Sequence, residues 1–412
     1  MKMVLKVGVV ILLILAVILA FNVGKIKRLL KVNALFEAEN IVHNFSNMNE
    51  VLYARDLAIS GDAHEWPETP EPMPETVDIY GEPRNVSDLL EQTSTTSFMV
   101  IRDGNVLFED YYLGTDVDDL RISWSMAKSY LSAMLGKAVS DGRIKSLDDA
   151  VSDYVPALKG SAYEGVPIRH VMNMASGVKF SEDYLDPKSD INKMGRVLGL
   201  GGSMDKFAAS LETQAYPSGT ARQYVSIDTH VLGMVLRSVT GKTLHDLFEE
   251  TFGSTLGFGK TPYYLTDGKG VAFALGGLNL RTRDYALFGQ LFLQGGEWKG
   301  EQIIPAKWVS ESTKASAPQN DLDETGVDYG YQWWVPTPHQ GDFFAVGIYG
   351  QYIYVNPSAN MVIVKNSAHR EFTENGPSGH SHKLETIALF RALAEHFKID
   401  DKAEIATETI SP

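Results

Sequence analysis

The stretch SWSMAKSYLSAMLGKAV, residues 123–139, places a serine and a lysine three positions apart at the start of a predicted helix. Apolar side chains recur along it at helical spacing, and Asp141-Gly142 ends it. Ser125 and Lys128 then share one face of the helix. Ser125 also lies at the helix N-terminus, where free backbone N–H groups stabilise a developing oxyanion. The spacing therefore suits acyl transfer, with Ser125 as nucleophile and Lys128 as a lysine kept partly neutral by burial.

The same spacing also fits a second interpretation, in which a serine caps the helix and the lysine is solvated. The Ser-x-x-Lys pattern occurs again at Ser203 and Lys206. That copy follows a glycine-rich loop and no strand hairpin precedes it, so Ser203 is predicted to be a helix N-cap. Spacing alone leaves both interpretations of Ser125 and Lys128 open.

The composition limits the class of protein. A chain of 412 residues indicates one two-lobed unit or two domains, and 44% hydrophobic residues supply a sizeable core. The net charge of −15 argues against nucleic acid as a partner, because phosphates require a basic face. The chain has no cysteine, which excludes disulfides, thiolate catalysis and cysteine zinc sites.

An apolar stretch near the N-terminus predicts a membrane anchor. Residues 4–23 supply the roughly 20 apolar positions that a spanning helix needs, with two polar interruptions and basic residues on both sides. No small-residue cleavage site follows, so residues 1–24 are expected to be an uncleaved transmembrane helix, with a cleaved signal peptide as the alternative. The basic residues after the span favour a cytoplasmic domain, whereas those before it favour the opposite orientation.

The rest of the chain divides by composition into two parts. Residues 25–89 are predicted to be an amphipathic juxtamembrane segment followed by a Pro/Glu-rich stretch, HEWPETPEPMPETVDIYGEP, which forms an extended linker or a wrapping arm. Residues 90–412 are predicted to be the main domain. Residues 96–114 indicate two strands joined at a turn, and residues 150–275 indicate a mostly helical lobe.

The C-terminal part adds a helix within residues 279–298, stopped by two glycines, two adjacent strands and a closing helix. The strands cover residues 343–357 and 361–368, and the closing helix covers residues 383–397. Strands at both ends with helices inserted between them predict a mixed α/β lobe and a helical lobe.

Two further motifs lie near the ends of predicted elements. Tyr224 and Ser226 stand at a loop-to-helix junction, and a tyrosine near a lysine ammonium ionises more readily and can act as a base. A core tyrosine is the alternative. Gly347 and Gly350 lie in an apolar strand, where glycine permits close approach of a ligand to the backbone.

The order of these motifs resembles the serine β-lactamase and penicillin-binding superfamily: Ser-x-x-Lys, then Tyr-x-Ser, then a glycine-bearing strand. It is most similar to the class C-like branch, which includes family VIII carboxylesterases and 6-aminohexanoate-dimer hydrolase. The supporting phrases are IRHVMNMASGVKFSEDYLDP (residues 168–187), YPSGTARQYVSIDTHVLGMVL (216–236) and LRTRDYALFGQLFLQGGEWKGEQIIPAKWV (280–309). The resemblance runs over residues 90–395. It implies a central antiparallel sheet flanked by helices, plus a helical lobe.

The resemblance also implies roles for the residues of the motifs. Ser125 would be the acylated nucleophile, and Lys128 would lower the proton affinity of Ser125 and Tyr224 and hold them in place. Tyr224 would act as general base and then as general acid to the leaving group. The oxyanion hole would consist of the backbone N–H groups of Ser125 and Ile348. No cofactor is implied.

The substrate side of the site departs from the β-lactamase pattern. Ala345 occupies the position where β-lactamases carry a lysine or histidine that binds the carboxylate of the antibiotic, and Arg222 is the candidate substitute. Ser226 stands where many relatives carry asparagine, and with Gly347 it is expected to support the substrate. Tyr184, in the SEDY loop, is expected to donate a hydrogen bond to an amide leaving group, or else to be a surface loop tyrosine.

The expected function is therefore a membrane-anchored serine hydrolase that cleaves a small ester, amide or short peptide through an acyl-enzyme. A β-lactamase or D-alanyl-D-alanine peptidase is the alternative, and an inactive relative that binds peptidoglycan or a protein is the second. No metal is expected, because His380 and His382 have no third ligand at suitable spacing. The expected location is the bacterial inner membrane, single-pass, with the catalytic domain in the periplasm.

Overall fold

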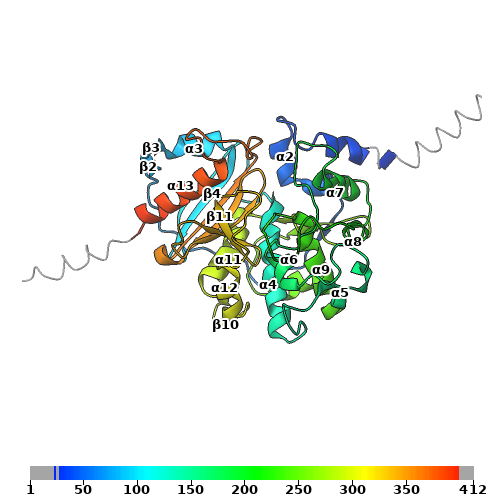
Figure 1. The fold of residues 1–412 in the computed structure, drawn as a ribbon. Coiled ribbons are helices and arrows are strands. Elements are labelled where there is room, and N and C mark those ends of the chain that lie inside the picture. The colour runs from blue at the N-terminus through cyan, green and yellow to red at the C-terminus, as the bar shows by residue number, and fades with distance from the viewer. Residues whose placement is uncertain (1–22, 25–26, 399–412) are drawn as a thin grey trace, which may run out of the picture.

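A seven-stranded antiparallel sheet forms the centre of one lobe of the computed structural model, which describes residues 23–24 and 27–398 (Figure 1). The strand order is β11-β12-β13-β14-β15-β4-β5, so the C-terminal strands pair with the N-terminal hairpin through β15 and β4. The strands are β4 Thr95–Arg102, β5 Asn105–Tyr111, β11 Val327–Gly330, β12 Trp333–Pro336, β13 Phe343–Gly347, β14 Gln351–Asn356 and β15 Met361–Ser367. The central antiparallel sheet predicted by the resemblance is confirmed.

Helices cover both faces of this sheet, because successive strand residues point to opposite sides. α11 (Thr282–Leu293) packs on β14, β15 and β4 on one face. On the other face, α13 (His382–His396) and α3 (Val86–Gln92) share a hydrophobic cluster with alternate strand residues. Smaller elements at this lobe are β2 Thr76–Ile79, β3 Glu82–Asn85, β9 Glu297–Trp298, β10 Glu301–Gln302, α12 Ala306–Ser312 and the 3₁₀-turn Pro357–Ala359.

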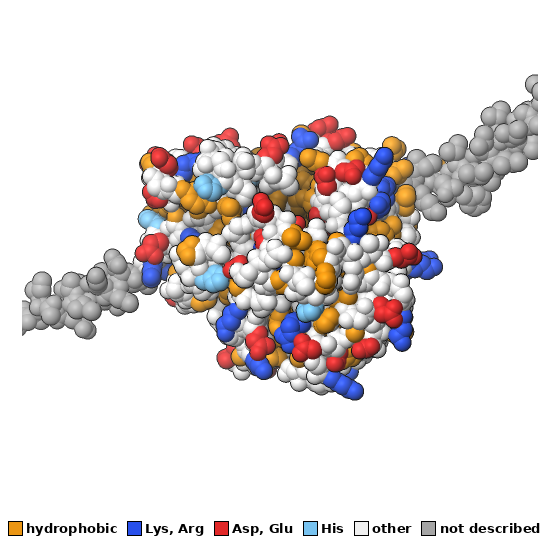
Figure 2. All heavy atoms as spheres, viewed as in Figure 1, with side chains coloured by type: hydrophobic (Ala, Val, Ile, Leu, Met, Phe, Trp, Pro, Cys, Tyr) orange, Lys and Arg blue, Asp and Glu red, His pale blue; other side chains and the backbone are white. Residues whose placement is uncertain are grey.

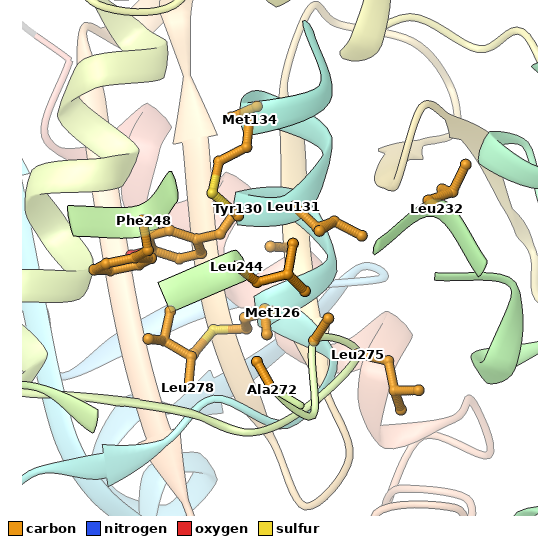
Figure 3. Packing of buried hydrophobic residues seen from close by; sticks show 14 of the residues in the cluster. Met126, Tyr130, Leu131, Met134, Leu232, Leu244, Phe248, Ala272, Leu275 and Leu278 are labelled. Carbon is orange, nitrogen blue, oxygen red and sulfur yellow. The ribbon is translucent and has the colours of Figure 1, made fainter. Parts of the chain in front are cut away.

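The helical lobe is inserted between β5 and α11. Its helices are α4 Ala127–Ser140, α5 Val151–Tyr154, α6 Ile168–Met172, α7 Asp190–Gly199, α8 Met204–Ala209, α9 Ser226–Thr240 and α10 Leu244–Phe248, with short turns at Trp124–Met126, Pro156–Leu158 and Glu249–Gly253. α4 lies at the junction of the lobes and buries Tyr130 and Met134, and Met126 in the turn before it is also buried (Figure 3). The Tyr130 ring stacks on Phe288 of α11, with centroids 3.7 Å apart.

Two elements differ from the sequence prediction. Residues 343–357 form a hairpin of β13 and β14 instead of one strand, because Tyr349 and Gly350 have φ values of +65° and +85° and turn the chain. The helix expected from residue 279 begins at Thr282, because Leu278–Leu280 is a strand, β8. β8 belongs to a small sheet of order β1-β7-β8-β6, made of Ala54–Asp56, Tyr263–Leu265, Leu278–Leu280 and Arg121–Ile122.

The N-terminal segment, residues 27–53, packs against the body of the molecule. It contains a helix over residues 27–33, α2 (Ile41–Ser46) and a 3₁₀-turn over Met48–Glu50, and its Phe45 side chain is fully buried. β1 follows and pairs with β7. The Pro/Glu-rich stretch continues as an extended arm along β5, where the Thr69 N–H donates to the Val106 carbonyl at 2.9 Å.

Within residues 23–24 and 27–398, no helix combines the length and apolar character needed to cross a bilayer. The predicted span, residues 1–24, lies almost entirely outside the described residues.

Candidate active site

Ser125 and Lys128 are in direct contact at the start of α4. The Lys128 ammonium donates hydrogen bonds to Ser125 Oγ at 3.0 Å and to the Leu275 carbonyl at 2.9 Å. Lys128 is buried, with 1% of its surface exposed. Burial lowers the pKa of Lys128 to about 7, although the carboxyls of Glu182 and Asp228 oppose that shift. Lys128 is therefore a partly neutral amine that can accept the serine proton.

The capping interpretation fails for Ser125 and holds for Ser203. The Ser125 side chain caps no helix end, and its lysine partner is buried rather than solvated. Ser203 Oγ accepts a hydrogen bond from the backbone N–H of Lys206 at 3.3 Å, and the Lys206 side chain is exposed. The two copies of the Ser-x-x-Lys pattern therefore differ in the burial of their lysines, and the predicted N-cap role of Ser203 is confirmed.

Tyr224 lies close to both residues but ionises less readily than expected. Lys128 Nζ is 5.3 Å from the centroid of the Tyr224 ring, which stacks on Trp334. Burial raises the pKa of Tyr224, and the charges of Glu182 and Asp323 raise it further, while a hydrogen bond with Ser125 partly offsets the rise. The expectation that the lysine would favour a phenolate is wrong in direction, because desolvation dominates. At neutral pH Tyr224 is a phenol that can donate its proton.

Glu182 is a part of the site that the sequence analysis missed. Its Oε1 accepts a hydrogen bond from the Ser226 backbone N–H at 2.5 Å, and its Oε2 accepts bonds from the hydroxyls of Ser226 and Tyr184, each at 3.2 Å. Burial raises the pKa of Glu182, and the Lys128 charge opposes the rise. The SEDY loop contained the signal, since Glu182 stands two residues before the tyrosine that the resemblance singled out.

A second buried carboxyl, Asp228, lies in the first turn of α9. The Tyr163 hydroxyl donates to Asp228 Oδ1 at 2.7 Å, and burial raises the pKa of Asp228 to about 8. Asp228 is therefore mostly protonated near neutral pH. The remaining negative charge next to Lys128 then depends mainly on Glu182.

Gly347 brings the end of β13 against the serine turn. A Cβ atom on Gly347 would lie 2.3 Å from the Ser123 carbonyl oxygen and 3.0 Å from the Ser125 backbone nitrogen. The close approach is therefore between two backbones, whereas the sequence suggested an approach to a ligand. Ile348 follows directly and lines the same cavity as Ser125. The two segments that carry the predicted oxyanion donors, Ser125 and Ile348, therefore meet beside this cavity.

The cavity next to Ser125 has a volume of about 380 Å³. Tyr184, Ser226 and Ile348 contribute to its lining, and Tyr184 remains 38% exposed. The other walls come from α7, from the loop before β8 and from the N-terminal segment. Hydrophobic side chains are visible in the hollow between the elements labelled α3 and α2 (Figure 2).

The residues considered for charge or metal binding have other partners. Arg222 is buried and forms an ion pair with Asp321 at 2.5 Å, so its guanidinium does not replace the cation absent at Ala345. His380 stacks on Tyr80, and His382 lies against His369. Across the described part of the chain, no three His, Cys, Asp or Glu side chains gather as metal ligands.

Comparison with known protein families identifies the family of this chain. The family model described as Beta-lactamase matches residues 83–385. The chain belongs to the beta-lactamase family. Members of the beta-lactamase family related to this chain include amidases and carboxylesterases, and the family works through an acyl-enzyme on a serine. The chain is therefore a serine hydrolase.

Individual relatives within the beta-lactamase family support the branch that the motifs resemble. The 6-aminohexanoate-dimer hydrolase of Paenarthrobacter ureafaciens is 31% identical over 291 residues, covering 68% of this chain and 74% of that protein. A structure from Bacillus anthracis, described as "Putative 6-aminohexanoate-dimer hydrolase", has a TM-score of 0.76 at 24% identity, covering 88% of this chain and 95% of the other. A family VIII carboxylesterase has a TM-score of 0.52 at 16% identity, covering 74% and 97%. The last two comparisons concern the fold.

Proposed function

We propose that the chain hydrolyses a small carboxylic ester or amide through an acyl-enzyme on Ser125. The observation that carries the proposal is the buried Lys128, hydrogen-bonded to Ser125 Oγ at 3.0 Å and with its pKa lowered to about 7. A nucleophilic serine needs a neighbouring base, and a lysine near neutrality can serve as one.

The proposed steps follow from the positions of the groups. The Lys128 amine takes the Ser125 proton while Oγ attacks the carbonyl carbon, and the backbone N–H groups of Ser125 and Ile348 stabilise the oxyanion. Tyr224 then donates its hydroxyl proton to the leaving oxygen or nitrogen and regains a proton from the Lys128 ammonium. In the second half, the Lys128 amine takes a proton from a water molecule as the water oxygen attacks the acyl carbon. The bond between the acyl carbon and Oγ then breaks, Oγ regains a proton from the Lys128 ammonium, and the carboxylic acid is released.

A small ester or amide is favoured over a β-lactam by two features. Ala345 supplies no cation for the carboxylate of an antibiotic, and the ion pair with Asp321 occupies Arg222. The relative from Paenarthrobacter ureafaciens is named for hydrolysis of an amide dimer, which supports amide chemistry. Turnover of a chromogenic β-lactam as fast as that of a simple ester would favour the β-lactamase alternative.

Labelling with a serine-directed probe tests whether Ser125 is the nucleophile. A fluorophosphonate is reacted with the full-length chain in detergent, and the adduct is located by mass spectrometry in wild type, Ser125→Ala, Lys128→Ala and Ser203→Ala. We expect an adduct on Ser125 that is absent from Ser125→Ala, strongly reduced in Lys128→Ala and retained in Ser203→Ala. An adduct confined to another residue, or none at all, would contradict the proposal and favour a binding role.

We also propose that residues 1–24 anchor the chain in a bacterial inner membrane, with the catalytic domain in the periplasm. The apolar length and flanking lysines of the sequence support an anchor. The absence of cysteine makes a single introduced thiol an unambiguous reporter. We expect the exposed Lys188→Cys variant to react with a membrane-impermeant maleimide in spheroplasts. Reaction only after lysis would place the domain in the cytoplasm.

A further inference from the structure

One wall of the cavity beside Ser125 is an apolar face of α7. Ile191, Met194 and Leu198 are buried and line the cavity, at the spacing of one helix face. Gly195 lies on the same face, and a Cβ atom built on it meets no other atom within 4 Å. The helix thus presents apolar side chains to the cavity and leaves open space at one position.

The N-terminal segment forms a second apolar wall. Val32, Leu35 and Phe36 line the cavity together with Leu52. This segment is held in place by packing, since Val32 would lie 3.4 Å from a Cβ atom on Gly199 of α7 and the Phe36 ring stacks on Tyr349 with centroids 5.0 Å apart. The residues that follow the predicted membrane anchor therefore enclose the space beside the nucleophile.

The polar side chains of this cavity are mostly engaged by the protein itself. Asn192 Nδ2 donates to the Asp186 carbonyl at 2.9 Å, and Arg196 Nη1 donates to the Pro187 carbonyl at 2.8 Å. Arg196 is the one charged side chain among the described lining residues, and no carboxylate is among them. The cavity surface is therefore mainly apolar, and Glu182, which does not line it, accepts hydrogen bonds from the lining residues Tyr184 and Ser226.

We propose that this cavity binds an uncharged hydrophobic acyl chain of the substrate, of medium length. The inference rests on the proposed function, because it assigns the cavity to the acyl side of the same reaction. Tyr224, the proposed proton donor to the leaving group, does not line the cavity, and Tyr184, which does, donates its hydroxyl hydrogen to Glu182. We therefore assign the cavity to the acyl part of the substrate. Each methylene transferred from water to this surface can raise kcat/KM by up to about fourfold.

The test measures kcat/KM for p-nitrophenyl acetate, butyrate and octanoate with the full-length chain in detergent. We expect kcat/KM to rise by at least about tenfold from butyrate to octanoate, since added methylenes are buried. A matched pair tests charge: p-nitrophenyl heptanoate against p-nitrophenyl 6-aminohexanoate, in which an ammonium replaces the terminal methyl group. We expect the heptanoate to be preferred. A flat or falling chain-length series, or preference for the aminohexanoate, would overturn the inference.

A substitution in α7 tests whether the dependence of kcat/KM on acyl-chain length arises in this cavity. Gly195→Leu fills the open space, so the octanoate-to-acetate ratio of kcat/KM should fall by about tenfold. Lys193→Leu introduces the same residue on the exposed side of the same helix and should keep the wild-type ratio. An octanoate-to-acetate ratio of kcat/KM that is equal in the two variants would overturn the placement of the acyl chain in this cavity. Fluorophosphonate labelling of Ser125 in the same samples separates this failure from failure of the proposed function.

Discussion

At the residue scale, the chemistry depends on the burial of one lysine. Lys128 is polar and short-range spacing places it next to Ser125, but only desolvation brings its pKa from the ordinary value of 10.5 to about 7. Below that pKa the amine is protonated and cannot accept the serine proton. The Glu182 charge opposes this shift, while burial raises the pKa of Glu182 itself and the Lys128 charge lowers it.

The pH dependence of acylation follows from this pKa. We expect kcat/KM to rise with pH through an apparent pKa near 7 and to fall about tenfold per pH unit well below it, because the neutral amine is lost. A stopped-flow or steady-state profile with p-nitrophenyl butyrate measures this limb. Lys206→Ala, which changes an exposed lysine, should leave the profile unchanged. A profile that is flat between pH 6 and 8 would argue against Lys128 as the base.

Removing the Glu182 carboxylate should shift the acid limb of the kcat/KM profile, because its charge acts on Lys128. Glu182→Gln keeps an oxygen for the Ser226 N–H but removes a charge that raises the pKa of Lys128. The acid limb of kcat/KM should therefore shift to lower pH in the variant. The same profile measures the shift, with Glu164→Gln at the surface as the control. A limb that stays in place, or moves to higher pH, would contradict the electrostatic role of Glu182.

At the element scale, the oxyanion site depends on how closely β13 approaches the serine turn. Residues on either side of the predicted donors, Trp124 and Tyr349, have positive φ values and are not glycine. Both rings contact Phe36 and Phe45 of the N-terminal segment. The strained turns are thus held by aromatic packing between elements that are distant in the sequence.

Gly347→Ala tests this close approach. The added methyl group would come within 2.3 Å of the Ser123 carbonyl oxygen, so β13 must move away from Ser125. Loss of one oxyanion donor lowers kcat by about 100- to 1000-fold, and we expect a loss of that order. Activity is measured beside far-UV circular dichroism and the thermal midpoint, which separate a displaced strand from an unfolded chain. Wild-type turnover would show that the strand position is unimportant for catalysis.

At the scale of the whole molecule, residues before the matched family region belong to the folded body. The family match begins at residue 83, yet the N-terminal segment contributes buried side chains to the largest hydrophobic cluster. The segment follows the predicted anchor directly and forms one wall of the proposed acyl-chain cavity. The two proposals therefore assign this short segment a wall of the acyl-chain cavity and a position directly after the membrane anchor.

Phe45→Ala should destabilise the whole domain. The side chain is fully buried among aromatic rings, so its removal should lower the free energy of unfolding by about 3–5 kcal/mol. Leu30→Ala, in the same segment but 63% exposed, should change it little. Urea unfolding followed by tryptophan fluorescence measures both variants. An equal, small effect in the two would indicate that the N-terminal segment is only loosely attached to the body.

The amino-acid sequence by itself determined the features that local rules decide. Asp103-Gly104 turns the hairpin of β4 and β5 because both residues adopt positive φ, and Asp141-Gly142 ends α4. The order of Ser125, Lys128 and Tyr224 identified the superfamily. These features depend on neighbours in the chain, which periodicity and turn chemistry describe.

Only the tertiary structure decided the features that depend on burial and on distant contacts. It lowered the pKa of Lys128, raised that of Tyr224 and brought Glu182 to Ser226. It also placed β13 against the turn that carries Ser125 and made the N-terminal segment a wall of the cavity. Desolvation and packing act between residues far apart in sequence, so the pattern along the chain contains the groups but not the environment that sets their chemistry.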